Sequence, residues 1–137
     1  MTQAETKNAA QPWTHGGVYW NELSVHDVAR AKKFYEATIG WRFEPMPMGE
    51  TTYWIIHSND KMVGGLFEMK GPEFANIPEH WLTYIAVDDV DARLKQAAGA
   101  GAKIVKEPFD IPGVGRMAVL SEPGGAVVAW MTPKPKA

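Results

Sequence analysis

Residues 18–41 read VYWNELSVHDVARAKKFYEATIGW, and this stretch decides the fold of the chain. Its first part, Val18–Val25, is rich in β-branched and aromatic side chains, which is typical of a β-strand. Asp27 follows and can cap a helix by accepting backbone N–H groups at the helix start. Gly40 fits the C-terminal end of that helix. The apolar spacing in between predicts an amphipathic helix, whose inward face carries Val28, Ala31, Phe34, Tyr35 and Ile39.

Three further strands are predicted after this helix, and they complete a strand–helix–three-strand unit. The polar stretch Ser58–Lys61 is typical of a turn between the last two of them. Glycine pairs such as Gly64-Gly65 match no phosphate-binding loop and are interpreted as turn residues. The three predicted strands are Trp41–Glu44, Thr51–His57 and Val63–Met69.

The same pattern then occurs a second time. A strand is predicted at Trp81–Val87, and Asp88 and Asp89 can cap the helix after it. That helix carries Val90, Leu94, Ala97 and Ala98 inward and ends at Gly99 and Gly101. The strands that follow it are Lys103–Glu107, Arg116–Leu120 and Ala126–Met131.

One offset relates the two copies along the chain. Asp89 follows Asp27 by 62 residues, and Met131 follows Met69 by the same number. Because internal repeats define a fold more securely than single motifs, we predict an α+β fold of two βαβββ repeats that form a curved eight-stranded cup. The repeats span residues 17–70 and 80–132 of a single domain at 17–132, with a flexible arm at 1–16 and a tail at 133–137.

Composition excludes several classes of function. The chain has 137 residues, of which 45% are hydrophobic and 22% charged, with a net charge of −2, so it is ordinary for a globular domain. Lys and Arg form no basic stripe for nucleic acid, and no apolar run is long enough to span a membrane. The absence of Cys excludes disulfides and thiolate metal sites. No export signal is evident, and we therefore expect a cytoplasmic location.

Three stretches, in this order, resemble the vicinal-oxygen-chelate superfamily, which contains glyoxalase, bleomycin-resistance and dioxygenase proteins. They are Ser24–Trp41, Ile85–Ala92 and Gly115–Gly125. The resemblance implies that each repeat forms half of a cup. It also implies that metal-using members take one ligand from the first strand and one from the fourth strand of each repeat.

The four ligand positions that the resemblance implies hold no metal ligand in this chain. Neither carbon-only side chains nor an indole suits a divalent ion. Shifting the positions by one residue gives either Asn21, Glu68, Thr83 and Trp130 or Tyr19, Leu66, Trp81 and Val128, and neither set contains three good ligands. We therefore expect no metal and no cofactor. The implied positions are Trp20, Phe67, Leu82 and Ala129.

Alternation along the strands predicts which residues line the cup. Leu23 and Val25 should face the first helix, which leaves Glu22 on the cup side. Ile85 and Val87 should likewise face the second helix, which leaves Tyr84 on the cup side. The predicted substrate-binding residues are Trp20, Trp54, Phe67, Leu82, Arg116 and Ala129.

Glu22 and Tyr84 are the predicted catalytic residues. A carboxylate that is desolvated among aromatic rings can act as a general base or acid, and a tyrosine hydroxyl can donate to an oxyanion. The alternative is that Glu22 lies at the mouth of the cup or pairs with Arg116, and that Tyr84 is a core aromatic residue.

Three functions compete on this evidence. The first is a metal-free protein that binds a small apolar or aromatic molecule, either with or without transforming it chemically. The second is a metal-dependent lyase, isomerase or dioxygenase, and the third is an accessory dimer with no ligand. We expect a small-molecule ligand and a homodimer, because Trp13, Trp41 and Trp130 are many large apolar groups to leave exposed, and we expect neither nucleic acid nor a membrane as partner.

Overall fold

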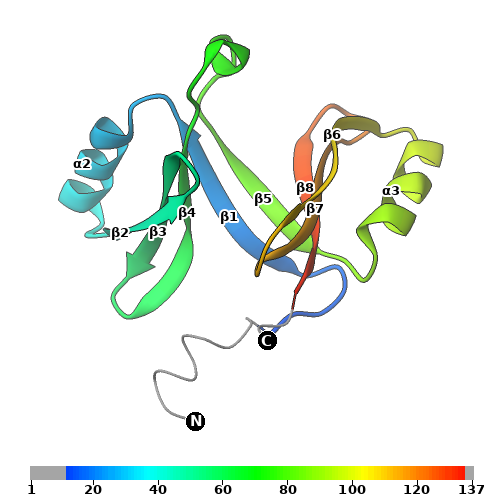
Figure 1. The fold of residues 1–137 in the computed structure, drawn as a ribbon, viewed down its shortest axis with the longest axis horizontal. Coiled ribbons are helices and arrows are strands. Elements are labelled where there is room, and N and C mark those ends of the chain that lie inside the picture. The colour runs from blue at the N-terminus through cyan, green and yellow to red at the C-terminus, as the bar shows by residue number, and fades with distance from the viewer. Residues whose placement is uncertain (1–11, 135–137) are drawn as a thin grey trace. The chain divides into compact units, whose positions relative to one another are not determined.

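The computed structural model describes residues 12–134, and these contain eight strands and two α-helices (Figure 1). They divide into two compact units. The first-repeat unit is Trp20–Leu82, and the second-repeat unit combines the described residues up to 19 with those from 83 onward. The elements are β1 (Val18–Val25), α2 (Val28–Thr38), β2 (Arg42–Met48), β3 (Thr51–Ser58), β4 (Lys61–Glu68), the short 3-10 helix η1 (Pro72–Phe74), β5 (His80–Ala86), α3 (Val90–Gly99), β6 (Lys103–Ile111), β7 (Gly115–Ser121) and β8 (Val127–Pro133).

In the first-repeat unit the strand order is β2-β3-β4-β1, with β1 parallel to β4 and the other pairs antiparallel. Helix α2 lies against one face of these strands (Figure 1). The buried core there consists of Leu23, Val25 and Leu66, which confirms the predicted facing of the first strand. The residues packed around this core are Val28, Ala31, Tyr35, Phe43 and Trp54.

The predicted inward face of the first helix is too wide. Phe34 is 58% exposed and Ile39 is 59% exposed, although both were expected in the core. Successive residues of a helix point about 100° apart, so Phe34 cannot face the strands when its neighbour Tyr35 does. Ile39 is the C-cap residue and lies beyond the last turn of α2. Gly40 has a positive φ of 74°, as predicted for a glycine that ends a helix.

In the second-repeat unit the strand order is β5-β8-β7-β6, with β5 parallel to β8. Val90, Leu94 and Ala97 of α3 are buried as predicted, whereas Ala98 is exposed. They share a core with Val87, Ala118, Leu120 and Val128. Trp130 packs against that core, and in the other unit Trp41 stacks on Tyr35 with ring centroids 4.7 Å apart. Two of the three tryptophans behind the dimer prediction therefore have partners within their own units.

Gly16 and Pro133, which border the predicted domain, lie within the described residues. Residues 1–11 of the predicted arm and 135–137 of the tail lie outside the described residues. Within the described part, Gly16 N–H donates to the Ala86 carbonyl over 2.7 Å, and Ala86 N–H donates to the Gly17 carbonyl over 2.9 Å. Pro133 is the last residue of β8. Gly16 and Pro133 thus take part in the folded region next to the predicted arm and tail.

The 62-residue offset holds for the first half of each repeat. Asp27 and Asp89 both cap their helices, through a carboxylate that accepts the backbone N–H of Arg30 over 2.9 Å and of Ala92 over 3.1 Å respectively. These two aspartates occupy equivalent positions, so the repeat prediction is confirmed there.

The offset is wrong for the last hairpin of the repeat. Leu23 pairs with Leu66, whereas its equivalent Ile85 pairs with Trp130, so the partners lie 64 residues apart rather than 62. Extra residues enter through β6, whose pairing with β7 shifts register at two places. Because side chains alternate with a period of two, a shift of two residues changes which residue is the equivalent of which but does not by itself move a side chain to the other face. Trp54 therefore corresponds to Ala118 and not to Arg116.

The glycine pair Gly64-Gly65 lies in β4, as the predicted strand Val63–Met69 required, so the separate interpretation of this pair as turn residues is wrong. Both residues are buried. A Cβ atom at Gly64 would overlap the carbonyl oxygen of Asn21 on the neighbouring strand β1. This glycine is thus required by close backbone approach rather than by chain reversal.

The ion pair between Asp88 and Arg93, at the start of α3, should stabilise the fold to an extent that depends on pH. Arg93 donates to both Asp88 carboxylate oxygens, over 2.8 and 2.9 Å, and His15 lies 3.4 Å from the same carboxylate. The hydrogen bonds from Arg93 lower the pKa of Asp88 from 3.8 to about 2. Because the pKa is lower in the folded state, the stabilisation is complete above about pH 4 and is lost as the pH falls toward 2.

An Asp88→Asn variant should therefore melt below the wild type above pH 4, by a small margin because the pair is exposed to solvent. This difference in melting temperature should decrease as the pH falls from 4 to 2. Thermal unfolding across this range measures it, with Asp60→Asn in an exposed turn as the control. A margin that stays constant with pH contradicts the assignment.

Candidate functional site

The strands of the first-repeat unit have a second face, opposite α2, which we call the Glu22 face. Its members alternate with residues that pack on the helix: Leu23 and Leu66 face α2, so their neighbours Glu22 and Gly65 face the other way. Glu22 pairs directly with Gly65, and Gly65 pairs with Ile55 of β3. On β1, β3 and β4 the Glu22 face consists of Trp20, Glu22, Ser24, Tyr53, Ile55, His57, Gly65 and Phe67.

An ordered aromatic group lies at the centre of this face. The Trp20 indole N–H donates to the Tyr53 hydroxyl over 2.9 Å. Tyr53 is only 8% exposed, and a Cβ atom at Gly65 would overlap its hydroxyl group. The hydroxyl therefore lies directly over the β4 backbone at the residue that pairs with Glu22. Trp20 and Glu22 are both half-buried, so this group has an apolar wall and a carboxylate side by side on one strand.

The sequence-predicted site residues divide between the two units. Trp20, Glu22 and Phe67 lie together on the Glu22 face as predicted. Leu82 is buried in β5, at 8% exposure. Tyr84 lies in the second-repeat unit, where it pairs with Ala129, and Ala129 is fully buried.

The predicted places of Trp54 and Arg116 are wrong, because both lie on the helix side of their strands. Trp54 packs against the α2 core, with the Lys32 ammonium 3.8 Å from its ring centroid. Arg116 donates to both carboxylate oxygens of Asp91 on α3, over 2.8 and 3.1 Å, and to Asp110 over 3.0 Å. The hydrogen bonds from Arg116 to Asp91 hold the pKa of Asp91 below its usual value. Arg116 is therefore engaged beside α3 by Asp91 and Asp110.

Sequence reasoning missed three residues of the Glu22 face or its border. Tyr53 was not separated from Trp54, because every residue from 53 to 56 is apolar or aromatic and no alternation is visible. His57 was predicted only as the last residue of the strand Thr51–His57, but its Nε2 atom lies 2.7 Å from the Glu44 carboxylate on β2. Phe74 of η1 packs edge-to-face on Phe67, with centroids 5.8 Å apart.

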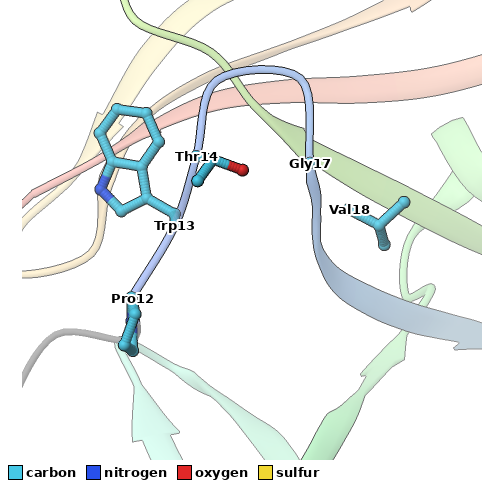
Figure 2. A pocket seen from close by; sticks show the side chains of 5 residues that line it. All are labelled: Pro12, Trp13, Thr14, Gly17 and Val18. Carbon is cyan, nitrogen blue, oxygen red and sulfur yellow. The ribbon is translucent and has the colours of Figure 1, made fainter.

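A separate hollow of about 250 Å³ lies beside the segment before β1 (Figure 2). Its lining has no titratable side chain, so it offers no group for acid–base chemistry. The lining residues are Pro12, Trp13, Thr14, Gly17 and Val18.

Two βαβββ repeats, each with a helix on one face of four strands, define the fold class of this protein. A family model described as the Glyoxalase/Bleomycin resistance protein/Dioxygenase superfamily matches residues 17–129, and the chain belongs to that family. Two solved structures share the fold: the hypothetical protein BH1468 of Bacillus halodurans (TM-score 0.68, 14% identity, 90% of this chain and 99% of that one) and methylmalonyl-CoA epimerase of Mycobacterium tuberculosis (0.65, 15%, 92% and 95%). At these identities the likeness shows the fold alone.

Two curated relatives are more similar in sequence. The glyoxylase-named protein CFP32 of Mycobacterium bovis is 41% identical over 122 residues, which cover 88% of this chain and 46% of CFP32. The anthracycline biosynthesis protein DnrV of Streptomyces peucetius is 32% identical over 129 residues, which cover 83% of this chain and 46% of DnrV. The chain thus spans about half the length of the curated relatives it matches. Among its described residues, no helix is both long and apolar enough to cross a membrane.

The residues at the expected metal positions do not fit a divalent ion. The corrected register makes Gly65, rather than Phe67, the equivalent of Ala129, since Glu22 pairs with Gly65 and Tyr84 pairs with Ala129. Gly65 has no side chain that could bind a metal, and the Tyr53 hydroxyl fills the space that such a side chain would need. Within residues 12–134, no cluster of three or more His, Asp or Glu residues could hold a metal ion.

Proposed function

We propose that this protein binds a small apolar or aromatic molecule on the Glu22 face without a metal ion. The observation that carries the proposal is the fixed Trp20–Tyr53 pair beside a half-buried carboxylate. Small-molecule sites typically combine apolar and aromatic walls with a few polar groups that set orientation. Trp20 and Phe67 supply such walls, and Glu22 supplies the polar group.

The Glu22 carboxylate sets the chemistry of the ligand. An ionised carboxylate only accepts hydrogen bonds, so it favours a ligand with a hydroxyl or ammonium group next to its apolar body. The name of DnrV, an anthracycline biosynthesis protein, makes an anthracycline a reasonable test ligand. Daunorubicin has a flat aromatic ring system, hydroxyl groups and one ammonium group.

The second candidate function is metal-dependent lyase, isomerase or dioxygenase chemistry. The donor set described above does not support it, because Trp20, Gly65, Leu82 and Ala129 provide no metal ligand. Acid–base chemistry by Glu22 itself is compatible with a metal-free site, and we propose it as a role secondary to binding.

Daunorubicin binding tests the proposed function. Wild-type protein should quench the fluorescence of daunorubicin saturably, and Glu22→Gln should weaken binding roughly tenfold, because a neutral amide cannot replace a charge-assisted hydrogen bond. Glu36→Gln on the exposed side of α2 is the matched control and should bind like the wild type.

Two arms of the same titration decide between the candidates. Protein treated with EDTA should bind daunorubicin as tightly as untreated protein. Loss of binding after EDTA, restored by zinc or nickel, would overturn the metal-free proposal. Equal binding by wild type and Glu22→Gln would remove Glu22 from the site.

A further inference from the structure

We infer that Tyr53 is a positioning residue that fixes the Trp20 indole as a flat wall, so that the Glu22 face selects planar aromatic ligands over puckered ligands of the same size. The inference rests on the proposed function and adds the class of ligand to it. Its basis is the contact of Tyr53 with Trp20 and Gly65, two residues on different strands.

Tyr53 itself has little freedom to move. It is 8% exposed, and its backbone lies in the middle strand of three, paired with Met46 of β2 and adjacent to the β3–β4 pair of Trp54 with Leu66. On the other side of the strand Trp54 is anchored against α2. Gly65 provides the space that the hydroxyl occupies, because any side chain there would displace it. The hydroxyl is thus a fixed acceptor.

That fixed acceptor determines the orientation of Trp20. An indole has a single hydrogen-bond donor, its Nε1–H, and here that donor is bonded to Tyr53 over 2.9 Å. Rotating the ring to another rotamer would break this bond in a half-buried setting, which is unfavourable. A wall that is already ordered loses little entropy when a ligand stacks on it, and stacking favours a flat π-system.

Two probes with the same carbon skeleton test this inference: 2-naphthol, which is planar, and 2-decalol, its fully saturated and puckered counterpart. Calorimetric titration should show that wild-type protein prefers 2-naphthol by roughly threefold to tenfold. Tyr53→Phe keeps the ring but removes the acceptor. It should bring the ratio of the two affinities, 2-naphthol over 2-decalol, close to one. Tyr35→Phe, a hydroxyl deletion in the α2 stack, is the matched control and should keep the wild-type ratio.

A spectroscopic readout separates positioning from a loss of folding. Six indole N–H resonances are expected in a ¹⁵N-labelled sample, one for each tryptophan, and Trp20→Phe identifies that of Trp20. In the wild type this proton should exchange slowly with solvent, and in Tyr53→Phe it should shift and exchange faster, while the other five stay in place. If Tyr53→Phe does not fold, Trp20→Phe can be used instead, because it removes the donor of the same hydrogen bond. It should likewise bring the ratio of the two probe affinities closer to one.

The outcomes distinguish failure of the inference from failure of the proposed function. In a Trp20→Phe background, adding Tyr53→Phe should change the probe ratio no further, because Tyr53 acts through the indole. Binding of both probes with an unchanged ratio in Tyr53→Phe overturns the inference and leaves the proposed function standing. Binding of neither probe by any folded form, together with no binding of daunorubicin, overturns both.

Discussion

Replacing Gly64 with alanine should lower the free energy of unfolding by about 2–3 kcal/mol, the upper part of the range for overpacked interiors. Gly64 is buried in β4, and the added Cβ would overlap the carbonyl oxygen of Asn21 in β1. That oxygen belongs to the backbone of a strand held by ladder pairs such as Glu22–Gly65, so it cannot rotate away as a side-chain end could. Relief requires the two parallel strands to separate.

Gly99→Ala is the matched control for Gly64→Ala. Gly99 is the last residue of α3, has open space where a Cβ atom would lie, and does not have a positive φ. Because alanine favours a helix over glycine by up to about 1 kcal/mol, this change should be neutral or stabilising. Urea unfolding of both variants measures the difference. If Gly64→Ala is as stable as Gly99→Ala, the close approach of β1 and β4 at this residue is wrong.

Local signals in the sequence were sufficient for the order of the strands and α-helices and for the caps, although β2 and β6 continue to Met48 and Ile111, past their predicted ends at Glu44 and Glu107. The strand Val18–Val25 has the bounds that its composition predicted, and Asp27 and Asp89 cap their helices as their positions indicated. Such features depend on residues within one turn or one strand, so the sequence contains their whole cause. The assignment of Leu23 and Val25 to the helix side followed in the same way from alternation and is confirmed.

Features that depend on pairing between distant segments were beyond the sequence. The two register shifts in β6 leave no compositional mark, so the last hairpin was aligned two residues away from its true equivalent. Trp54 and Arg116 were assigned to the wrong face for a related reason, since their strands lack a clear polar–apolar alternation. The role of Gly65 depends on the Tyr53 hydroxyl from another strand, and a lone glycine does not reveal that contact.

Core truncation gives the second large effect, and it tests the corrected helix face. Leu66→Ala should lower the free energy of unfolding by about 3 kcal/mol, because Leu66 is fully buried between Leu23, Val25 and α2. The melting temperature should fall by roughly ten degrees for a domain of this size. Both quantities follow from the loss of apolar burial together with the cavity that the smaller side chain leaves.

Phe34→Ala is the informative partner of Leu66→Ala, because the sequence pattern placed Phe34 in the same core. The structure leaves Phe34 58% exposed, with an edge-to-face contact to Tyr35 at 4.9 Å between ring centroids. Removing it should therefore cost no more than about 1 kcal/mol, which is the loss of one exposed aromatic pair. Guanidinium unfolding of the two variants in parallel gives both values. A loss for Phe34→Ala that equals the loss for Leu66→Ala would mean that α2 is rotated about its axis so that Phe34, rather than Tyr35, faces the strands.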